Sequence, residues 1–453
     1  MQQETIRLLD RWGGKFICAL LTLHRRFLSL LLKNRSAEPT ERILFLKLIE
    51  QGATVLAYSA LKRAVEMVGE KNLYFLVFAE NRPILDLMEI IPRENVITIR
   101  RDHFHYFLWD TLKALWFCRR MGIDTTVDME FFARASAIIA YLTGARKRVG
   151  LHRFTSEGPY RGDLMTHRVQ YNPHLHTAIS YRSLVEAISY DPSDIPLLKV
   201  NVSQWLEETP HFQPRAEEQA KVEALLETLG SRGARPPLVL LNPNASDLMP
   251  LRKWPTERFI ALGKSLLAAQ KEITLVITGA PAEAESAQKI ATELGSERVV
   301  SVAGKTSLRE LFVLYTMADI LVTNDSGPAH FSSMTDIHSV VLFGPETPKL
   351  FGALSPKSQV ISAGLACSPC VNVFNHRFSP CTNNRCMQEI SVEDVFAKVQ
   401  AILWNEYGRP SETRVKYRSW SEKLRDLPAE ESPEIRRPEI HPRFQAEHLR
   451  SDL

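Results

Sequence analysis

The chain has 453 residues, of which 45% are hydrophobic and 24% charged, and it carries a net charge of only +4. This length suits two or three domains, and the composition is that of a globular protein. The small net charge does not favour a nucleic-acid partner, and no apolar run is long enough for a transmembrane helix. The early apolar stretch is interrupted by His24-Arg25-Arg26 and lacks a cleavage site. We therefore expect a cytoplasmic protein with no secretory signal and mostly reduced cysteines.

Residues 1–35 are predicted to form an amphipathic helix ahead of the first strand. Polar residues recur there at steps of three and four, and most of them are basic. They are Arg7, Arg11, Lys15, Cys18, Thr22, Arg25, Arg26, Ser29 and Lys33. A basic face opposite a wide apolar face is typical of a helix that lies in an anionic membrane interface. The alternative is a helix that packs on the protein's own core. We prefer the membrane, because the sequence offers this leader no internal partner.

Residues 40–230 are predicted to form a first α/β domain. Short apolar runs, separated by helical segments, predict strands at 42–48, 73–78, 96–99, 125–128 and 148–150. Strands that alternate with helices indicate a parallel, doubly wound sheet, whose ligands bind beyond the carboxyl ends of the strands. Glu50, Gly52 and Asp128 fall at these ends.

Two acidic sites follow strands of this domain. Glu50 lies in the loop after the first strand, where a carboxylate can act as a general base. The alternative for Glu50 is a solvent-facing carboxylate at the start of a helix. Asp128 and Glu130 flank a helix entry, where we expect a cap and a solvated charge rather than a metal site.

Residues 151–183 form a long basic loop that includes Arg153 and Arg161. Arginine makes forked hydrogen bonds to phosphate and carboxylate, so this loop suits an anionic acceptor. The alternative is a mobile surface loop, and the sequence favours neither interpretation over the other.

Residues 236–405 are predicted to form a second α/β domain after a linker at 231–237. Its central feature is the segment 324–330, which follows a buried apolar run and precedes another. We expect a tight turn that leads into a short helix, with Pro328 in its first turn. Such a turn directs backbone N–H groups at one point and is suited to bind phosphate.

Several other polar residues are expected at the same edge of the second sheet. Cations and helix N-terminal amides neutralise a diphosphate, and a carboxylate accepts both hydroxyls of a ribose. The candidate residues are Asn242, Arg252, Lys253, Glu283, Asp325, Ser326, Gly327 and His330.

Four cysteines, Cys367, Cys370, Cys381 and Cys386, cluster near the end of this domain. Their proximity suggests a structural zinc site, although the second pair is spaced more widely than is usual. The alternatives are buried free thiols or a disulfide formed on oxidation. The tail at 408–453 is charged, rich in proline and poor in apolar residues, so we predict that it is disordered.

The sequence resembles glycosyltransferase family 9, the bacterial heptosyltransferases of lipopolysaccharide core assembly. The resemblance covers residues 41–405, and its most specific part is Asp325-Ser326-Gly327-Pro328-Ala329-His330 followed by Leu342-Phe343-Gly344-Pro345. Weaker support comes from Arg252-Lys253-Trp254-Pro255, Gly279 with Glu283, the segment Ile43–Lys47 and Gly52.

The resemblance implies a GT-B fold, in which two Rossmann-like domains face a cleft. The first domain would hold the acceptor, through Gly52, Arg153 and Arg161. The second would hold a sugar nucleotide, typically ADP-heptose. Ser326, Gly327, His330 and Lys253 would lie near its diphosphate, Glu283 at the ribose and Asp325 near the sugar. The family inverts the anomeric carbon and requires no metal cofactor.

One departure from the family pattern concerns the catalytic base. The family usually has Gly-Asp in the first loop, whereas this chain has Gly52-Ala53, and a methyl group cannot take a proton. We expect Glu50, from the same loop, to supply the carboxylate and to activate an acceptor hydroxyl. The alternatives are a base elsewhere and an altered, inactive relative.

The predicted function is therefore transfer of a heptose-like sugar from an ADP-sugar to an anionic lipopolysaccharide-type glycolipid. The enzyme is expected at the inner face of the cytoplasmic membrane. The competing functions are a non-catalytic binding relative and a GT-B nucleotide-sugar epimerase.

Overall fold

The computed structural model describes residues 3–31, 38–205, 208–229, 237–245, 249–375 and 377–407, with side chains from residue 10 onward. These residues belong to one compact unit that ends at Tyr407. The predicted tail at 408–453 and most of the predicted linker lie outside the described residues. No helix within the described ranges is long and apolar enough to cross a bilayer.

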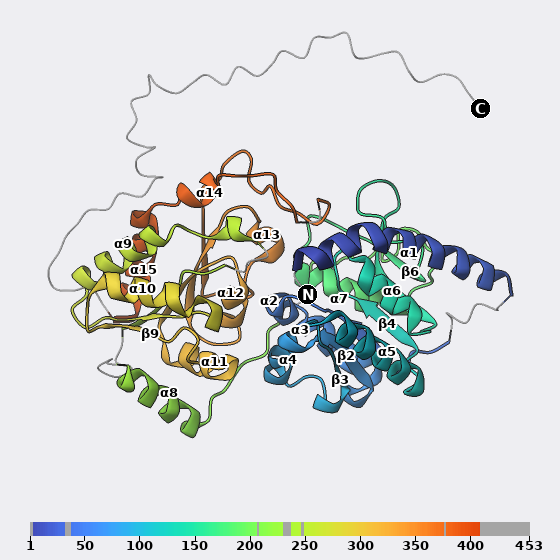
Figure 1. Cartoon of the computed structure of the whole chain (residues 1–453), viewed down its shortest axis with the longest axis horizontal. Coiled ribbons are helices and arrows are strands. Elements are labelled where there is room, and N and C mark those ends of the chain that lie inside the picture. The colour runs from blue at the N-terminus through green and yellow to red at the C-terminus, as the bar shows by residue number, and fades with distance from the viewer. Residues whose placement is uncertain are drawn as a thin grey trace, which may run out of the picture. The chain divides into compact units, whose positions relative to one another are not determined.

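The first half forms a six-stranded parallel sheet in the order β3-β2-β1-β4-β5-β6 (Figure 1). Its strands are β1 (Ile43–Leu46), β2 (Leu73–Phe78), β3 (Val96–Ile99), β4 (Thr125–Asp128), β5 (Lys147–His152) and β6 (His167–Gln170). The central strands β1, β2 and β4 are buried along their whole length, as expected for a sheet that is covered on both faces. The α/β class predicted from the sequence is thus confirmed, with one additional edge strand, β6.

Alternation along β1 assigns the two faces of this sheet. Ile43 and Phe45 pack with α2 (Gln51–Leu56), α3 (Tyr58–Val68), α4 (Arg82–Met88) and α7 (Thr177–Glu186). Leu44 and Leu46 point the other way and pack with α1 (Gln3–Leu31), α5 (Phe104–Arg120) and α6 (Arg134–Leu142). Successive strand residues face opposite sides, so one apolar run builds both cores.

The second half forms another six-stranded parallel sheet, in the order β12-β11-β10-β7-β8-β9. Its strands are β7 (Leu238–Asn242), β8 (Thr274–Ile277), β9 (Val299–Ser301), β10 (Ile320–Asn324), β11 (His338–Phe343) and β12 (Ser358–Ser362). One face is covered by α9 (Thr256–Ala269), α10 (Ala284–Leu294) and α15 (Val392–Tyr407). The other face is covered by α8 (Ala216–Thr228), α11 (Leu308–Met317) and α12 (Gly327–Ser332).

Short elements complete the connections. They are α13 (Pro348–Phe351), α14 (Arg385–Gln388) and the 3-10 turns Glu70–Asn72, Ala79–Asn81, Arg93–Asn95, Ala187–Ser189, Pro250–Arg252 and Pro281–Glu283.

The two halves meet where α2 approaches α12. A Cβ atom on Gly52 would lie 2.5 Å from Cδ2 of His330 and 3.2 Å from Cα of Gly327. The absence of a side chain at Gly52 therefore allows the first loop to lie directly against the 324–330 turn. A second junction is formed by the segment between α7 and α8, where the Phe212 N–H donates to the Met334 carbonyl at 2.7 Å.

Candidate active site

A cavity of about 560 Å³ is lined by residues that follow the carboxyl ends of β1, β7, β8 and β10. Its volume falls in the range typical of small-molecule sites, and its position is the one at which open α/β sheets bind ligands. Nine of the residues predicted from the sequence line it: Glu50, Gly52, Asn242, Arg252, Glu283, Asp325, Ser326, Gly327 and His330.

Three predicted residues lie elsewhere. Lys253 does not line the cavity, so Arg252 is the member of that basic pair that faces it. Arg161 is 2% exposed and forms an ion pair with Asp128, which leaves it no access to an acceptor in this arrangement. Arg153 donates to the Gly158 carbonyl at 3.2 Å, away from the cavity.

The 324–330 segment has the predicted local structure. β10 ends at Asn324, Ser326 is the N-cap of α12, and Pro328 lies in the first turn of that helix. The Asn324 side chain accepts from the Trp254 N–H at 3.0 Å and donates to the Asn244 carbonyl at 3.1 Å. These two bonds hold the basic segment 252–254 beside the turn.

Several buried polar atoms around the cavity have no hydrogen-bond partner among the described residues. They are Nδ2 of Asn244, Nε of Arg252, Oδ2 of Asp325 and Nδ1 of His330. Buried polar atoms are normally paired, so a group of unpaired ones beside a cavity marks a place where a polar ligand binds.

His330 is uncharged in this site. Burial lowers its pKa to about 3, and the positive charges of His176 and Arg252 act in the same direction. At neutral pH the imidazole is therefore a neutral hydrogen-bonding group rather than a cation. Positive charge at the cavity comes from Arg252 and from Arg101 and Arg377, which also line it.

Asp325 belongs to a buried acidic pair that the sequence did not reveal. The other member of the pair is Glu346, and Arg252 contacts both acids. Its Nη1 lies 3.8 Å from Oδ2 of Asp325 and 3.5 Å from Oε2 of Glu346. Burial and the carboxylate of Glu346 raise the pKa of Asp325 well above its ordinary value, and Arg252 opposes them. Two carboxyl groups that share one cation in a buried site hold a proton more tightly than an isolated carboxyl group does.

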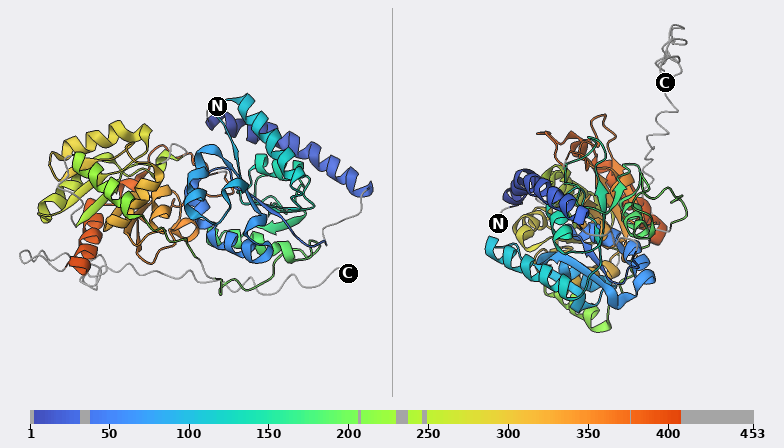
Figure 2. Two further views of the ribbon diagram at one scale, coloured as in Figure 1. Left: turned by 90° about the horizontal axis from the view of Figure 1, so that it is seen from below. Right: turned by 90° about the vertical axis from the view of Figure 1, so that its right-hand side faces the viewer.

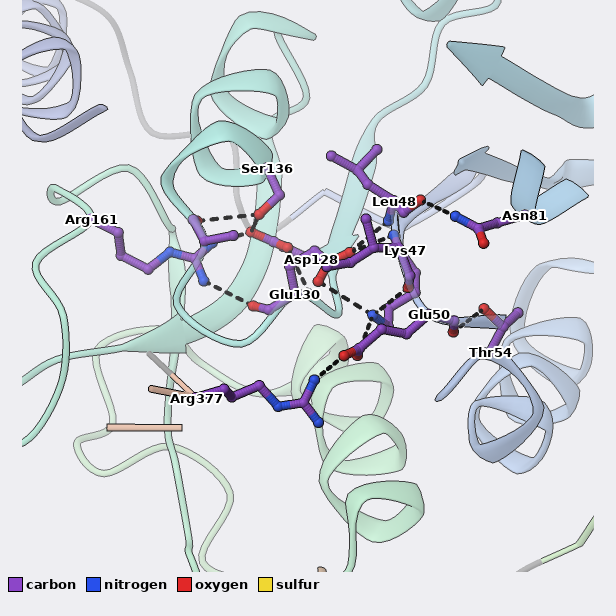
Figure 3. Close-up of polar contacts among 12 residues, drawn as sticks. Lys47, Leu48, Glu50, Thr54, Asn81, Asp128, Glu130, Ser136, Arg161 and Arg377 are labelled. Carbon is purple, nitrogen blue, oxygen red and sulfur yellow. Dashed lines mark hydrogen bonds and ion pairs between the residues drawn. The ribbon is translucent and has the colours of Figure 1, made fainter. Parts of the chain in front are cut away.

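Glu50 is held in an ionic cluster at the start of α2 (Figure 3). One carboxylate oxygen pairs with Arg377 and the other lies 3.4 Å from Nζ of Lys47. Burial would raise the pKa of Glu50, but the charges of Arg377, Lys47 and Arg252 lower it to about 2. Its backbone is left-handed, with φ of 70°, a conformation that a residue other than glycine adopts at a cost of about 1–3 kcal/mol.

Asp128 and Glu130 lie next to this cluster inside the protein and do not face solvent. Both are buried, which corrects the expectation of a solvated charge. Glu130 accepts from the backbone N–H groups of Leu48 and Ile49 and lies 3.3 Å from Lys47 Nζ. It therefore fixes the loop that presents Glu50. Asp128 is held in turn by Arg161 and Ser136, and Figure 3 shows both side chains directed at its carboxylate.

Arg377, Glu346, Lys47 and Glu130 are the functional candidates that sequence reasoning missed. The one signal for Glu346 was its place directly after the Phe-Gly-Pro run. Arg377 gave no signal, because its role depends on Glu50, which is 327 positions away.

The four clustered cysteines are unpaired, and they differ in exposure from exposed Cys367 to buried Cys386. Burial raises the pKa of Cys386, and the thiols of Cys370, Cys381 and Cys367 raise it further. Within the described part of the chain, no three His, Cys, Asp or Glu side chains are arranged to hold a metal ion. The zinc site therefore stays a prediction.

Comparison with known proteins gives consistent matches. A sequence model of glycosyltransferase family 9 (heptosyltransferase) matches residues 123–377. Lipooligosaccharide heptosyltransferase 2 of Campylobacter jejuni is 27% identical over 173 residues, which cover 37% of this chain and 51% of that protein. The chain thus spans about half the length of this curated relative.

Solved structures agree over a greater length. The Escherichia coli ADP-heptose lipopolysaccharide heptosyltransferase II structure gives a TM-score of 0.61 at 20% identity, covering 81% of this chain and 99% of that one. The E. coli heptosyltransferase WaaC with ADP gives 0.51 at 17%, covering 80% and 99%. This likeness confirms the GT-B fold that the sequence resemblance implied.

Proposed function

The chain belongs to glycosyltransferase family 9, and we propose that it transfers a heptose or related sugar from an ADP-sugar to a lipopolysaccharide core or similar glycolipid, with inversion. The observation that carries this proposal is that the 325–330 turn and the Glu50 loop line the same cavity. One side offers unpaired polar atoms and a cation to a nucleotide diphosphate. The other offers a carboxylate to an acceptor hydroxyl.

The donor lies, in this proposal, along the carboxyl edge of the second sheet. The α12 turn, Arg252 and the neutral His330 bind the diphosphate, and Glu283 lies at the ribose. Arg252 balances the charge that gathers on the leaving diphosphate, which is electrostatic stabilisation by a preorganised group. The ADP in the E. coli WaaC structure supports an adenine nucleotide as the donor. We propose that these protein groups need no metal cofactor.

Glu50 acts as the base in this proposal, and Arg377 controls its proton affinity. A carboxylate with a pKa of about 2 is a weak base, because proton transfer is most efficient when the pKa lies near the working pH. The donor diphosphate is a stronger partner for Arg377 than one carboxylate, because it carries more negative charge and also accepts the forked hydrogen bonds of arginine. When Arg377 turns to the donor, the pKa of Glu50 rises and the base becomes competent. Donor binding would thus precede activation of the acceptor.

One further reading is favoured by a specific observation. Ala53 replaces the usual acid of the family, and Glu50 is ion-paired in the structure. A non-catalytic relative that only binds a sugar nucleotide has these same features.

The acceptor is proposed to be anionic and membrane-embedded, which places the enzyme at the inner face of the cytoplasmic membrane.

The test combines purified chain, ADP-heptose and a lipopolysaccharide-core acceptor. The proposal expects ADP release and an acceptor whose mass increases by one heptose, and it expects Asp325→Asn to abolish both. Asp336→Asn, at an exposed position, is the matched control and should transfer normally. Donor binding without release of ADP would favour the binding relative. Conversion of the donor without acceptor would favour an epimerase.

A further inference from the structure

Helix α1 packs on the protein mainly through its polar face, whereas a surface helix normally packs through its apolar face. Most of its inward residues are small or polar, namely Asp10, Gly14, Cys18, Thr22 and Arg25, and Leu21 packs beside them against the core of the first sheet. Asp10 accepts from the backbone N–H groups of Arg134 and Ala135 at 3.0 and 2.8 Å, which caps the start of α6. A Cβ on Gly14 would lie 2.9 Å from Cβ of Arg134, so the helix packs closely there.

The same attachment continues along the helix. Thr22 Oγ1 accepts from the Asp163 N–H at 2.9 Å, and Arg25 pairs with the Asp163 carboxylate at 2.7 Å. The orientation of α1 is therefore fixed by specific polar contacts over four turns. The sequence predicted no internal partner for this leader, whereas these contacts attach it to α6 and to Asp163.

The outward face of α1 consists of large apolar side chains. Phe16 is 75% exposed and Leu30 83%, and the others are Trp12, Leu20, Leu23 and Phe27. A surface helix normally turns such residues toward the core. Here they form a long exposed apolar strip, and such strips mark interaction sites.

Helix α5 adds a second strip on the same side of the first sheet. Its inner residues Ala114, Leu115 and Cys118 share a core with Cys18 of α1, and Figure 2 shows both helices along one side. Trp109 and Trp116 point outward and are 57% and 59% exposed, with Phe104 and Leu112 beside them. Both helices therefore present exposed apolar side chains on the same side of the first sheet.

Cations border this surface at regular places. Lys15 lies 5.4 Å from the Trp12 ring, Lys113 5.2 Å from Trp109, and Arg120 5.1 Å from Trp116. From residue 11 to 31 the sequence of α1 contains no Asp or Glu. Tryptophan with adjacent Lys or Arg is the composition of proteins that lie at the level of lipid headgroups.

A cationic hollow lies at the C-terminal ends of the two helices. It is lined by Arg25 of α1 and Arg119 of α5, with Arg146, Arg148 and Arg168 from the sheet behind them. Three of these cations have carboxylate partners, since Arg25 and Arg168 pair with Asp163 and Arg146 pairs with Glu38. Among the described residues, Arg148 instead donates to the backbone carbonyls of Leu164 and Ala145. Burial and the charge of Arg25 lower its pKa to about 10. Cations crowded in this way favour an anionic group between them.

We propose that the outer faces of α1 and α5 form a docking surface for a bilayer that contains anionic phospholipids. The apolar strips enter the headgroup region, Lys15, Lys113 and Arg120 meet the surface charge, and headgroup phosphates occupy the hollow. A second copy of the chain is disfavoured as the occupant, because two such faces would bring like charges together. The docking surface deepens the proposed membrane-bound acceptor, but it does not depend on sugar transfer.

The experiment measures co-sedimentation of the full chain with vesicles of phosphatidylcholine alone and of phosphatidylcholine with phosphatidylglycerol. We expect binding to the anionic vesicles, weakened at least tenfold by Phe16→Ser with Phe27→Ser and, separately, by Trp109→Ser with Trp116→Ser. Phe378→Ser, which removes an equally exposed aromatic side chain from the second half, should bind as the parent does. Lys113→Glu with Arg120→Glu should remove the preference for anionic vesicles.

Equal binding by the α5 variants and the parent would overturn the two-helix surface. Self-association that the serine variants abolish, without vesicle binding, would assign the face to a second copy. Circular dichroism excludes misfolded variants. Transfer to a water-soluble, delipidated acceptor should be unchanged in the serine variants, so loss of docking is distinguished from failure of the proposed reaction.

Discussion

Arg377 pairs with Glu50 across the two halves of the chain, and it also contacts Glu346, with Nε 3.3 Å from Oε1. One guanidinium thus joins the acceptor-side carboxylate to the acidic pair of the second domain. Glu50 and Glu346 share this cation, and a bound diphosphate would compete with both of them. The contact therefore couples donor binding to the state of the proposed base.

Arg377→Gln tests this coupling. Loss of the guanidinium removes the largest influence that lowers the pKa of Glu50, so that pKa should rise toward the ordinary 4.5. We expect weaker donor binding, with KM for the donor raised about tenfold. We also expect a smaller difference between the acid limb of kcat/KM, which reports the free enzyme, and that of kcat, which reports the substrate-bound enzyme. The measurement is kcat and KM against pH. An unchanged donor KM would contradict the proposed contact of Arg377 with the diphosphate.

Glu50→Gln tests the base itself. The variant keeps the shape of the side chain but cannot accept a proton, so transfer should fall about 100-fold or more while nucleotide binding by calorimetry persists. A second change gives a sharper control, because Ala53→Asp restores the acid usual in the family. Partial recovery in the Glu50→Gln, Ala53→Asp double variant would show that a carboxylate in this loop is what the reaction lacks. Full activity of Glu50→Gln alone would place the base elsewhere.

Much of the fold followed from the sequence because its buried strands are short, β-branched and apolar. The two strands that were missed, β6 (HRVQ) and β12 (SQVIS), are polar edge strands, whose outer side needs no apolar cover. The turn at 324–330 was predictable because its chemistry is local, with Asp, Ser, Gly and Pro in consecutive positions.

The ionic cluster and the orientation of α1 could not be predicted, for different reasons. Arg377 acts through contacts with two distant segments, and no local pattern distinguishes it from a surface arginine. In α1 the periodicity correctly indicated an amphipathic helix. Which face turns inward depends on Arg134, Asp163 and the other groups that receive Asp10, Thr22 and Arg25, and periodicity carries no information about them.

Gly52→Ala tests the contact between the two halves. The added methyl group would lie 2.5 Å from His330 Cδ2, so the first loop and α12 must separate. Overpacking of this kind typically costs about 1–3 kcal/mol. We expect a lower melting temperature and a kcat/KM reduced at least tenfold. Gly13→Ala is the control, because no atom lies within 4 Å of its added Cβ. Equal stability of the two variants would mean that the halves adjust freely at this contact.

The raised pKa of Asp325 predicts a pH dependence of stability with a definite sign. Between the ordinary pKa of a carboxyl, 3.8, and its higher value in the folded chain, Asp325 holds a proton when folded and releases it when unfolded. Its contribution to stability is therefore full at low pH and is lost as pH rises through the folded pKa. Asp325→Asn removes this dependence, since the amide does not titrate. Urea unfolding from pH 5 to 9 should show a steeper decline for the parent than for Asp325→Asn, whereas Asp336→Asn should follow the parent. Parallel curves for the parent and Asp325→Asn would contradict the raised pKa of Asp325.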